Sequence, residues 1–291
     1  MSKIALGTVQ FGLDYGVGSA NKKTSLMEVK DILHYAKLKG VGLLDTAPAY
    51  GDSEEILGKS GVSGFDIVTK TRYFKGSVVS DNDADLMELD LDSSLLKLKL
   101  DSVYGMLLHN ANDALKTGSD KLFGRFEKLK QQGKVRKIGV SIYDHEQLQS
   151  IINNHNIDLV QVPFNILDRR LIDLDMFTTL KKKKVEIHVR SIFLQGLLLM
   201  DRENMPCKFH RWNGLWKIWH EWLSDNHLTA LEATVRYVNS IEGISKILVG
   251  VNSKDHLEGI IDASHGELPD IPVELSTNDI LLLNPSYWGE L

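Results

Sequence analysis

The chain has 291 residues, of which 43% are hydrophobic and 25% charged, and its formal net charge at pH 7 is −5. This composition excludes a disordered or fibrous chain, and the mild acidity argues against nucleic acid as a partner. The single cysteine, Cys207, excludes an internal disulfide framework and a multi-cysteine metal site. No apolar stretch reaches the roughly 20 residues that span a bilayer, so we expect a cytoplasmic protein without a membrane partner.

Eight short apolar runs alternate with longer amphipathic segments. The runs are brief and apolar enough to be strands buried on both faces, and they span residues 3–8, 42–45, 66–69, 102–108, 137–141, 159–162, 186–190 and 246–249. Helical patterns occupy residues 25–38, 53–58, 84–98, 119–131, 146–153, 172–182, 228–239 and 254–260. Strands that are each followed by a helix predict a (β/α)8 TIM barrel, with residues 1–291 forming a single domain.

The structural alternative is a doubly wound open sheet, which shows the same alternation. It is disfavoured because no glycine-rich turn follows the first strand. Two segments fall outside the eight units: an extra helical loop after the seventh strand, residues 193–226, and a C-terminal tail, residues 268–291. In a barrel such segments can cover the catalytic end, so we expect them to contribute to substrate selection.

Three tryptophans in the extra loop, Trp212, Trp216 and Trp219, recur at spacings of four and three residues and therefore share one face of a helix. This face either packs on the barrel or, together with Tyr287 or Trp288 of the tail, lines a pocket for a carbohydrate-like ring. The pattern is compatible with both interpretations.

Polar side chains stand where the expected strands end, which in a barrel is the end that holds active sites. Asp45 closes the second strand, Lys70 the third and His109 the fourth, and Tyr50 follows Asp45 by five residues. An unperturbed tyrosine has a pKa near 10, too high for an efficient proton donor at neutral pH. A lysine ammonium nearby should lower that pKa, and a paired aspartate should keep the ammonium charged. A histidine beside them should orient a carbonyl oxygen.

These residues lie in segments that resemble the aldo-keto reductases. The similarity runs in order from about residue 3 to residue 260, and it includes Leu6-Gly7-Thr8, residues 44–47 with Tyr50-Gly51, Thr69-Lys70, Leu107-Leu108-His109, and residues 134–141, 161–165 and 196–198. The resemblance implies an NAD(P)H-dependent oxidoreductase that converts an aldehyde or ketone to the alcohol. Its catalytic tetrad falls on Asp45, Tyr50, Lys70 and His109, with Tyr50 as the general acid.

The resemblance also implies that the barrel binds NADP(H), or NAD(H), without a Rossmann fold. In the family a Ser-Asn pair and a Gln hold the nicotinamide amide, and these positions fall on Ser141, Ile142 and Gln161, so Ile142 departs from the pattern. The position that stacks on the nicotinamide falls on Arg190, which can instead face the substrate. The cofactor-binding residues that the resemblance implies are Thr8, Ser141, Gln161, Arg190, Ser191, Gly196, Gly250, Asn252, Lys254 and His256.

The implied partner is a small-molecule carbonyl substrate. Residues 190–196 are loosely similar to family members associated with sugar and polysaccharide biosynthesis, which suggests a sugar-derived substrate. The alternative function is a nicotinamide-nucleotide-binding regulatory subunit with little catalysis, similar to channel-associated members of the family. An isomerase or hydrolase would need facing carboxylates or a metal site at the strand ends, and the sequence predicts no metal site.

Overall fold

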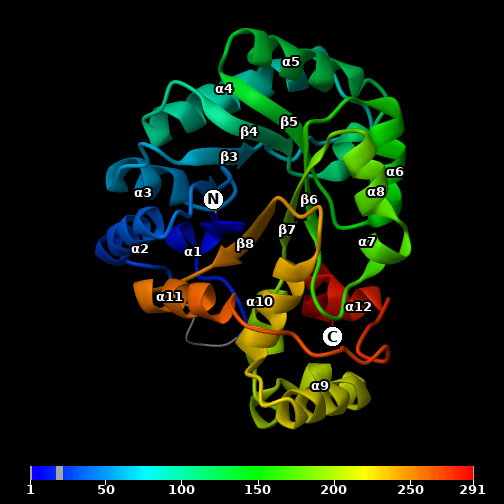
Figure 1. The fold of residues 1–291 in the computed structure, drawn as a ribbon. Coiled ribbons are helices and arrows are strands. Elements are labelled where there is room, and N and C mark those ends of the chain that lie inside the picture. Colours follow the sequence, from blue (N-terminus) through cyan, green and yellow to red (C-terminus); the bar gives the residue numbers. More distant parts are fainter. Residues whose placement is uncertain (1, 18–21, 291) are drawn as a thin grey trace.

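The computed structural model describes residues 2–17 and 22–290. Its eight strands are all parallel and pair in chain order, and β8 pairs with β1, so the sheet closes into a barrel (Figure 1). The strands are β1 Ile4–Gly7, β2 Leu43–Asp45, β3 Asp66–Lys70, β4 Val103–Leu108, β5 Val135–Ser141, β6 Leu159–Pro163, β7 Glu186–Arg190 and β8 Lys246–Gly250. The predicted (β/α)8 barrel is confirmed, and the open doubly wound sheet is excluded.

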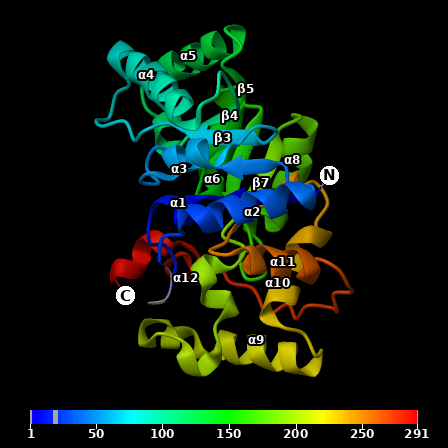
Figure 2. The same cartoon turned by 90° about the vertical axis from the view of Figure 1, so that its left-hand side faces the viewer.

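Helices surround the barrel on its outside (Figures 1 and 2). They are α1 Val9–Gly12, α2 Leu26–Leu38, α3 Ser53–Ser60, α4 Asp81–Leu98, α5 Asp120–Gln131, α6 His145–Asn154, α7 Arg170–Asp173, α8 Met176–Lys182, α9 Asn213–Asp225, α10 Ala230–Ser240, α11 Lys254–Ala263 and α12 Ile280–Leu283. The single helix expected at residues 172–182 is instead two helices, because Asp175 takes a left-handed backbone conformation with φ of 48°. Within the described ranges, no helix is both long and apolar enough to cross a membrane.

The pleat of the strands decides which side chains enter the barrel. Six apolar side chains form a cluster at its centre: Ala5, Leu43, Val68, Leu107, Leu159 and Leu248. Because side chains alternate between the two faces of a strand, the residue two positions further along also points inward, nearer the carboxyl end. That layer includes Asp45, Lys70, His109, Gln161 and Gly250. The polar residues at the strand ends therefore converge above the apolar centre.

The opposite end of the barrel holds a polar cluster around Glu186 of β7. Its carboxylate accepts a hydrogen bond from the Tyr104 hydroxyl at 2.7 Å and one from Lys137, and it pairs with His188 Nε2 at 2.8 Å. Burial raises the pKa of Glu186, but the hydrogen bonds from His188, Lys137 and Tyr104 outweigh burial and lower this pKa to about 2. The carboxylate is therefore charged at neutral pH and fully engaged within the fold.

The predicted extra layer after β7 is present. It contains short 3₁₀ helices, among them Leu194–Leu199, followed by α9, which lies outside the other helices in both views (Figures 1 and 2). Trp216 and Trp219 of α9 are fully buried, and their indole N–H groups donate to the Phe209 and Leu198 carbonyls at 2.9 and 3.2 Å. For these two indoles the packing interpretation is correct, and the carbohydrate pocket is wrong.

Candidate active site

A buried ion pair lies at the centre of the candidate site. Asp45 ends β2 and Lys70 ends the neighbouring β3, and their side chains are 5% and 1% exposed. Lys70 Nζ donates to Asp45 Oδ1 at 2.8 Å, to Asp45 Oδ2 at 2.7 Å and to the Thr46 carbonyl at 2.9 Å. Burial lowers the pKa of Lys70, and the charge and hydrogen bond of Asp45 oppose that shift. These contacts use all three donors of the ammonium, so its position is fixed.

Tyr50 lies next to this pair, in the loop between β2 and α3. Lys70 Nζ is 4.8 Å from the centroid of the Tyr50 ring, so the ammonium faces the ring. Burial first, and the Asp45 carboxylate second, raise the pKa of Tyr50 well above its usual value, while Arg190 opposes them. The lowered pKa expected from the sequence is therefore wrong for this structure. The reason is that burial of the phenol and the Asp45 charge outweigh the neighbouring positive charges.

His109 follows β4 and brings the fourth side chain of the predicted tetrad to the same place. Its ring meets that of Tyr50 edge-on, with centroids 5.8 Å apart and planes at 83°, and the Tyr73 ring stacks on it at 4.9 Å. Burial, and then the charges of Lys70 and Arg190, lower the pKa of His109 to about 3. The imidazole is therefore neutral at pH 7, with one nitrogen able to donate a hydrogen bond and the other able to accept one.

Three of these four residues open into one cavity of about 310 Å³. Asp45, Tyr50 and His109 line this reaction cavity, whereas Lys70 lies outside its lining. Eight of the predicted cofactor residues line it as well: Thr8, Ser141, Arg190, Ser191, Gly196, Gly250, Asn252 and His256. The volume lies at the lower end of the range usual for small-molecule sites. The structure thus brings the predicted catalytic residues and most of the predicted cofactor residues to one place.

Two predicted cofactor residues do not line the reaction cavity. Gln161 is fully buried, and its Nε2 donates to Asp45 Oδ1, so it supports the ion pair from β6. Lys254 begins α11 with its N–H donating to Glu28 Oε1 at 2.8 Å, and its ammonium lies 5.6 Å from the centroid of the Tyr35 ring. Lys254 therefore contacts α2 rather than the cavity.

Arg190 contributes a positive charge to the wall of the reaction cavity. Its guanidinium donates to the Ile142 carbonyl at 2.6 Å and to Ser191 Oγ at 3.3 Å, and lies 3.9 Å from the centroid of the Tyr143 ring. Within residues 2–17 and 22–290, no carboxylate forms an ion pair with it. Its remaining donors are available to a ligand in the cavity.

The residues of the site fit a nicotinamide cofactor in their hydrogen-bonding chemistry. Three buried polar atoms near the cavity, Gln10 Oε1, His109 Nδ1 and Gln161 Oε1, have no hydrogen-bond partner among the described residues. Buried polar atoms are rarely left unpaired in folded proteins, and the amide and hydroxyl groups of a ligand would pair them. The described part of the chain contains no group of three or more His, Cys, Asp or Glu residues suited to a metal ion.

Several residues of the cavity wall were not expected from the sequence. Tyr143 lines it and lies two residues after Ser141, so the alternation rule extended beyond the strand would have found it. Tyr15 also lines it and accepts a hydrogen bond from Gln195 at 3.0 Å. No periodic signal marks Tyr15 or Gln195, because Tyr15 lies in a loop and Gln195 at a non-helical position within the 3₁₀ helix Leu194–Leu199.

Comparisons relate the chain to known proteins. The family model described as "Aldo/keto reductase family" matches residues 3–275. "Uncharacterized oxidoreductase YqkF" of Bacillus subtilis is 24% identical over 284 residues, covering 91% of this chain and 92% of that protein. "NADH-specific methylglyoxal reductase" of Escherichia coli is 25% identical over 227 residues, covering 71% and 68%. The structure of glycerol dehydrogenase AKR11B4 from Gluconobacter oxydans is similar with a TM-score of 0.72 at 21% identity, covering 93% of this chain and 88% of that one.

Proposed function

Because the chain belongs to the aldo/keto reductase family, we propose that it reduces an aldehyde or ketone to the alcohol, with a nicotinamide cofactor as the reductant and Tyr50 as the proton donor. The observation that carries this proposal is the convergence of Asp45, Tyr50, Lys70 and His109 at one end of the barrel. Family membership supports an oxidoreductase. The role given to Tyr50 rests on its position beside a buried ammonium and a neutral imidazole.

A bound nicotinamide cofactor would supply hydride to the carbonyl carbon. From the resemblance, the residues that would hold it are Thr8, Ser141, Gln161, Arg190, Ser191, Gly196, Gly250, Asn252, Lys254 and His256. The Thr8 hydroxyl and N–H both donate to the Asp45 carbonyl, at 2.9 Å each. At the start of α11 the N–H groups of Lys254 and His256 already donate to Glu28 Oε1 at 2.8 Å and Ser253 Oγ at 3.1 Å, so a phosphate there would compete with these acceptors.

The proton moves from the Tyr50 hydroxyl to the carbonyl oxygen. The phenol is protonated at neutral pH, as a proton donor must be, but its raised pKa makes release of the proton harder. The positive charges of Lys70 and Arg190 then stabilise the phenolate that remains. Neutral His109 donates a hydrogen bond to the same oxygen and orients it. Asp45 acts on Tyr50 indirectly, by holding the Lys70 ammonium in place.

The substrate that we propose is a sugar-derived carbonyl compound. The reaction cavity supports this choice because Tyr15, Arg190 and Gln195 line it and offer hydrogen bonds to hydroxyl groups. Two similar proteins are named for methylglyoxal and glycerol, which are small and polar. For the cofactor we propose NADPH with a modest preference over NADH.

The test is oxidation of NADPH and NADH over a panel of aldehydes, ketones and aldoses, with wild-type protein and Tyr50→Phe. We expect turnover by the wild type and at least about a hundredfold loss in the variant, the scale of losing a general acid. Cofactor dissociation constants, measured by fluorescence, should be unchanged. Near-normal turnover in Tyr50→Phe would refute its role. Tight nucleotide binding by the wild type without turnover on any compound would instead indicate the regulatory subunit.

A further inference from the structure

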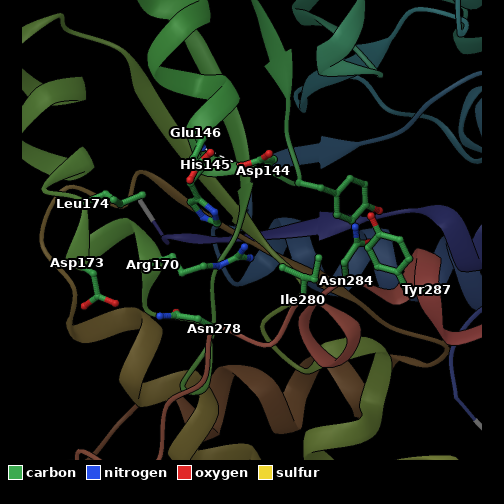
Figure 3. Close-up of a pocket in the computed structure, with 11 residues that line it drawn as sticks. Asp144, His145, Glu146, Arg170, Asp173, Leu174, Asn278, Ile280, Asn284 and Tyr287 are labelled. Atoms are coloured by element: carbon green, nitrogen blue, oxygen red, sulfur yellow. Dashed lines mark hydrogen bonds between the residues drawn. The ribbon is translucent and has the colours of Figure 1, made fainter. Parts of the chain in front are cut away.

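A second cavity, of about 460 Å³, lies next to the reaction cavity, and Tyr143 lines both. Its walls come from three places in the chain: the start of α6, α7 with the residue after it, and the tail between residues 278 and 287 (Figure 3). The volume is well within the range of small-molecule sites. None of the four tetrad residues lines it, so a ligand here would be separate from the reacting groups. We call it the tail cavity.

His145 gives the tail cavity a buried polar group. The residue is 2% exposed, and its ring projects from the start of α6 toward the Arg170 guanidinium (Figure 3). Neither ring nitrogen makes a hydrogen bond of good geometry with the described residues, although the Pro163 carbonyl lies close enough to favour a proton on the ring. That carbonyl can satisfy at most one nitrogen, so the other is left for a ligand.

Arg170 gives the tail cavity donors in a fixed orientation. Its Nε donates to Asp168 Oδ1 and its Nη2 donates to Asp168 Oδ2, both at 2.8 Å, and Asp168 is 1% exposed. This bidentate pair holds the guanidinium rigidly. Nη1 makes no hydrogen bond to the described residues, so its two N–H groups remain available to the cavity.

The charges around the tail cavity disfavour an anion. Asp168 already neutralises Arg170, and the other charged lining residues are the exposed carboxylates of Asp144, Glu146 and Asp173. A phosphate or carboxylate would be repelled by these groups. A neutral ligand can donate hydroxyl hydrogens to the carboxylates and accept hydrogen bonds from Arg170 and the tail.

The remaining lining suits the same kind of ligand. Asn278 and the Tyr287 hydroxyl add polar groups from the tail, and neither makes a side-chain hydrogen bond with the described residues. Ile280 and Leu174 supply apolar surface between the polar groups. A sugar likewise combines polar and apolar surface, with hydroxyls around its edge and C–H groups on its faces. The Tyr287 ring can match both, because a tyrosine has an apolar face and a polar hydroxyl.

We propose that the tail cavity binds a neutral polyhydroxylated compound, a sugar or polyol, through His145, Arg170, Asn278 and Tyr287. This inference goes beyond the proposed reductase activity and does not depend on it, because it concerns binding alone. An occupant would lie against Tyr143, which packs on Arg190 in the reaction cavity.

The test is calorimetric titration with methyl α-D-glucoside and with sorbitol, neither of which carries a free carbonyl group. The double variant Asn278→Ala, Tyr287→Phe removes two ligand contacts and no hydrogen bond of the described fold. We expect saturable binding to the wild type and a dissociation constant raised about tenfold or more in the double variant, as the loss of two hydrogen bonds predicts. Asn204→Ala, an exposed asparagine in the layer after β7 and outside both cavities, is the matched control and should bind like the wild type.

Three results would overturn the proposal. Wild-type protein with no saturable binding of either probe would contradict it directly. Binding that is equal in the wild type and the double variant would place the polyol elsewhere. Binding of inorganic phosphate that the double variant weakens, without polyol binding, would show an anion site instead. Calorimetry needs no turnover, so failure of the reductase proposal in the substrate panel remains distinguishable from failure here.

Discussion

At the scale of single residues, the reaction site depends on a lysine that has no free donor. The Lys70 ammonium is 1% exposed, and its hydrogen bonds go to Asp45 and the Thr46 carbonyl. Gln161 binds the same aspartate from β6. A buried ion pair contributes little net stability, whereas removing one partner leaves an uncompensated buried charge. The pair is therefore best understood as a device that positions a positive charge under Tyr50.

Lys70→Met should lose stability and activity together. Breaking a buried pair costs about 3 to 5 kcal/mol of the free energy of unfolding, and losing the charge beside Tyr50 should lower reduction at least about a hundredfold. Asp45→Asn should be impaired less, because Asp45 acts on Tyr50 only through Lys70, whose ammonium keeps its hydrogen bond to the Thr46 carbonyl and can still donate to the asparagine oxygen. Urea unfolding of the two single variants and the double variant gives their free energies of unfolding, and kcat for each gives the loss of reduction. Lys70→Met with the wild-type rate and pH profile would make Lys70 purely structural.

His109 should make folding depend on pH in a known direction. Its pKa is about 3 in the folded chain, lowered first by burial, against an ordinary value of 6.5. The unfolded chain therefore binds a proton at His109 that the folded chain does not bind. The contribution of His109 to the free energy of unfolding is complete above pH 6.5 and is lost as the pH falls toward 3. His109→Asn should flatten the pH dependence of the unfolding free energy across that interval. An NMR titration that places the His109 pKa near 6.5 would contradict the argument.

His145 requires a control in that experiment. Burial lowers the pKa of His145 to about 4, so its contribution to the free energy of unfolding is also lost as the pH falls, as for His109. His145→Asn and the variant with both substitutions separate the two contributions. If His109→Asn changes nothing while His145→Asn removes the pH dependence, the burial of His109 is not what determines it.

At this scale the sequence predicts positions better than energies. Polar residues at the ends of the expected strands were sufficient to select Asp45, Lys70 and His109, because the carboxyl ends of parallel strands converge in a closed barrel. It was not sufficient for the direction of the Tyr50 pKa shift. That direction depends on how deeply the phenol is buried and on its separation from Asp45, which the chain order does not encode.

At the scale of elements, local chemistry made the helices predictable. Thr229 and Glu232 form a capping box at the start of α10, and Ser25 caps α2, so side chains near these helix starts satisfy free backbone donors. The irregular segments were not predictable in this way. The hydrogen bond between Gln195 and Tyr15 joins residues 180 positions apart, and no local pattern specifies such a pairing.

The start of α11 limits how strongly NADPH can be preferred. The Lys254 N–H donates a hydrogen bond to the Glu28 carboxylate of α2 at 2.8 Å. This N–H lies at the start of α11, where the positive end of the helix dipole favours negative charge. The resemblance implies that this region would receive the adenosine phosphate of the cofactor, so the carboxylate would repel the additional phosphate of NADPH. Lys254 offers a point charge rather than a bidentate grip.

We therefore expect NADPH to bind better than NADH by about tenfold to a hundredfold, or roughly 1.4 to 2.7 kcal/mol. Lys254→Ala should remove most of this preference and leave NADH binding nearly unchanged, whereas Glu28→Gln should increase the preference. Fluorescence titrations of both nucleotides measure it, with the exposed Lys217→Ala on α9 as the control. A thousandfold preference, or one unaffected by Lys254→Ala, would mean that another residue, such as Arg202 after β7, holds the phosphate.

At the scale of the whole molecule, tryptophans join the additional layer after β7 to the C-terminal tail. Trp219 donates to the Leu198 carbonyl in the segment after β7, and Trp222 donates to the Asp270 carbonyl in the tail at 3.0 Å. Trp212 donates to Asp279 at 2.9 Å. The layer after β7 and the C-terminal tail are therefore bonded to each other, so neither should be able to unfold while the other keeps its contacts.

The chain should consequently unfold in one cooperative step, as expected for a single domain. All five tryptophans lie between residues 212 and 288, so their fluorescence reports on the additional layer and the tail, whereas far-UV circular dichroism is dominated by the helices around the barrel. Urea transitions followed by the two signals should coincide. Trp222→Phe, which removes the bond to the Asp270 carbonyl, should move both transitions together by about 1 kcal/mol. If fluorescence changes at a lower urea concentration than circular dichroism, the layer after β7 and the tail unfold separately from the barrel, and the single-domain prediction is wrong.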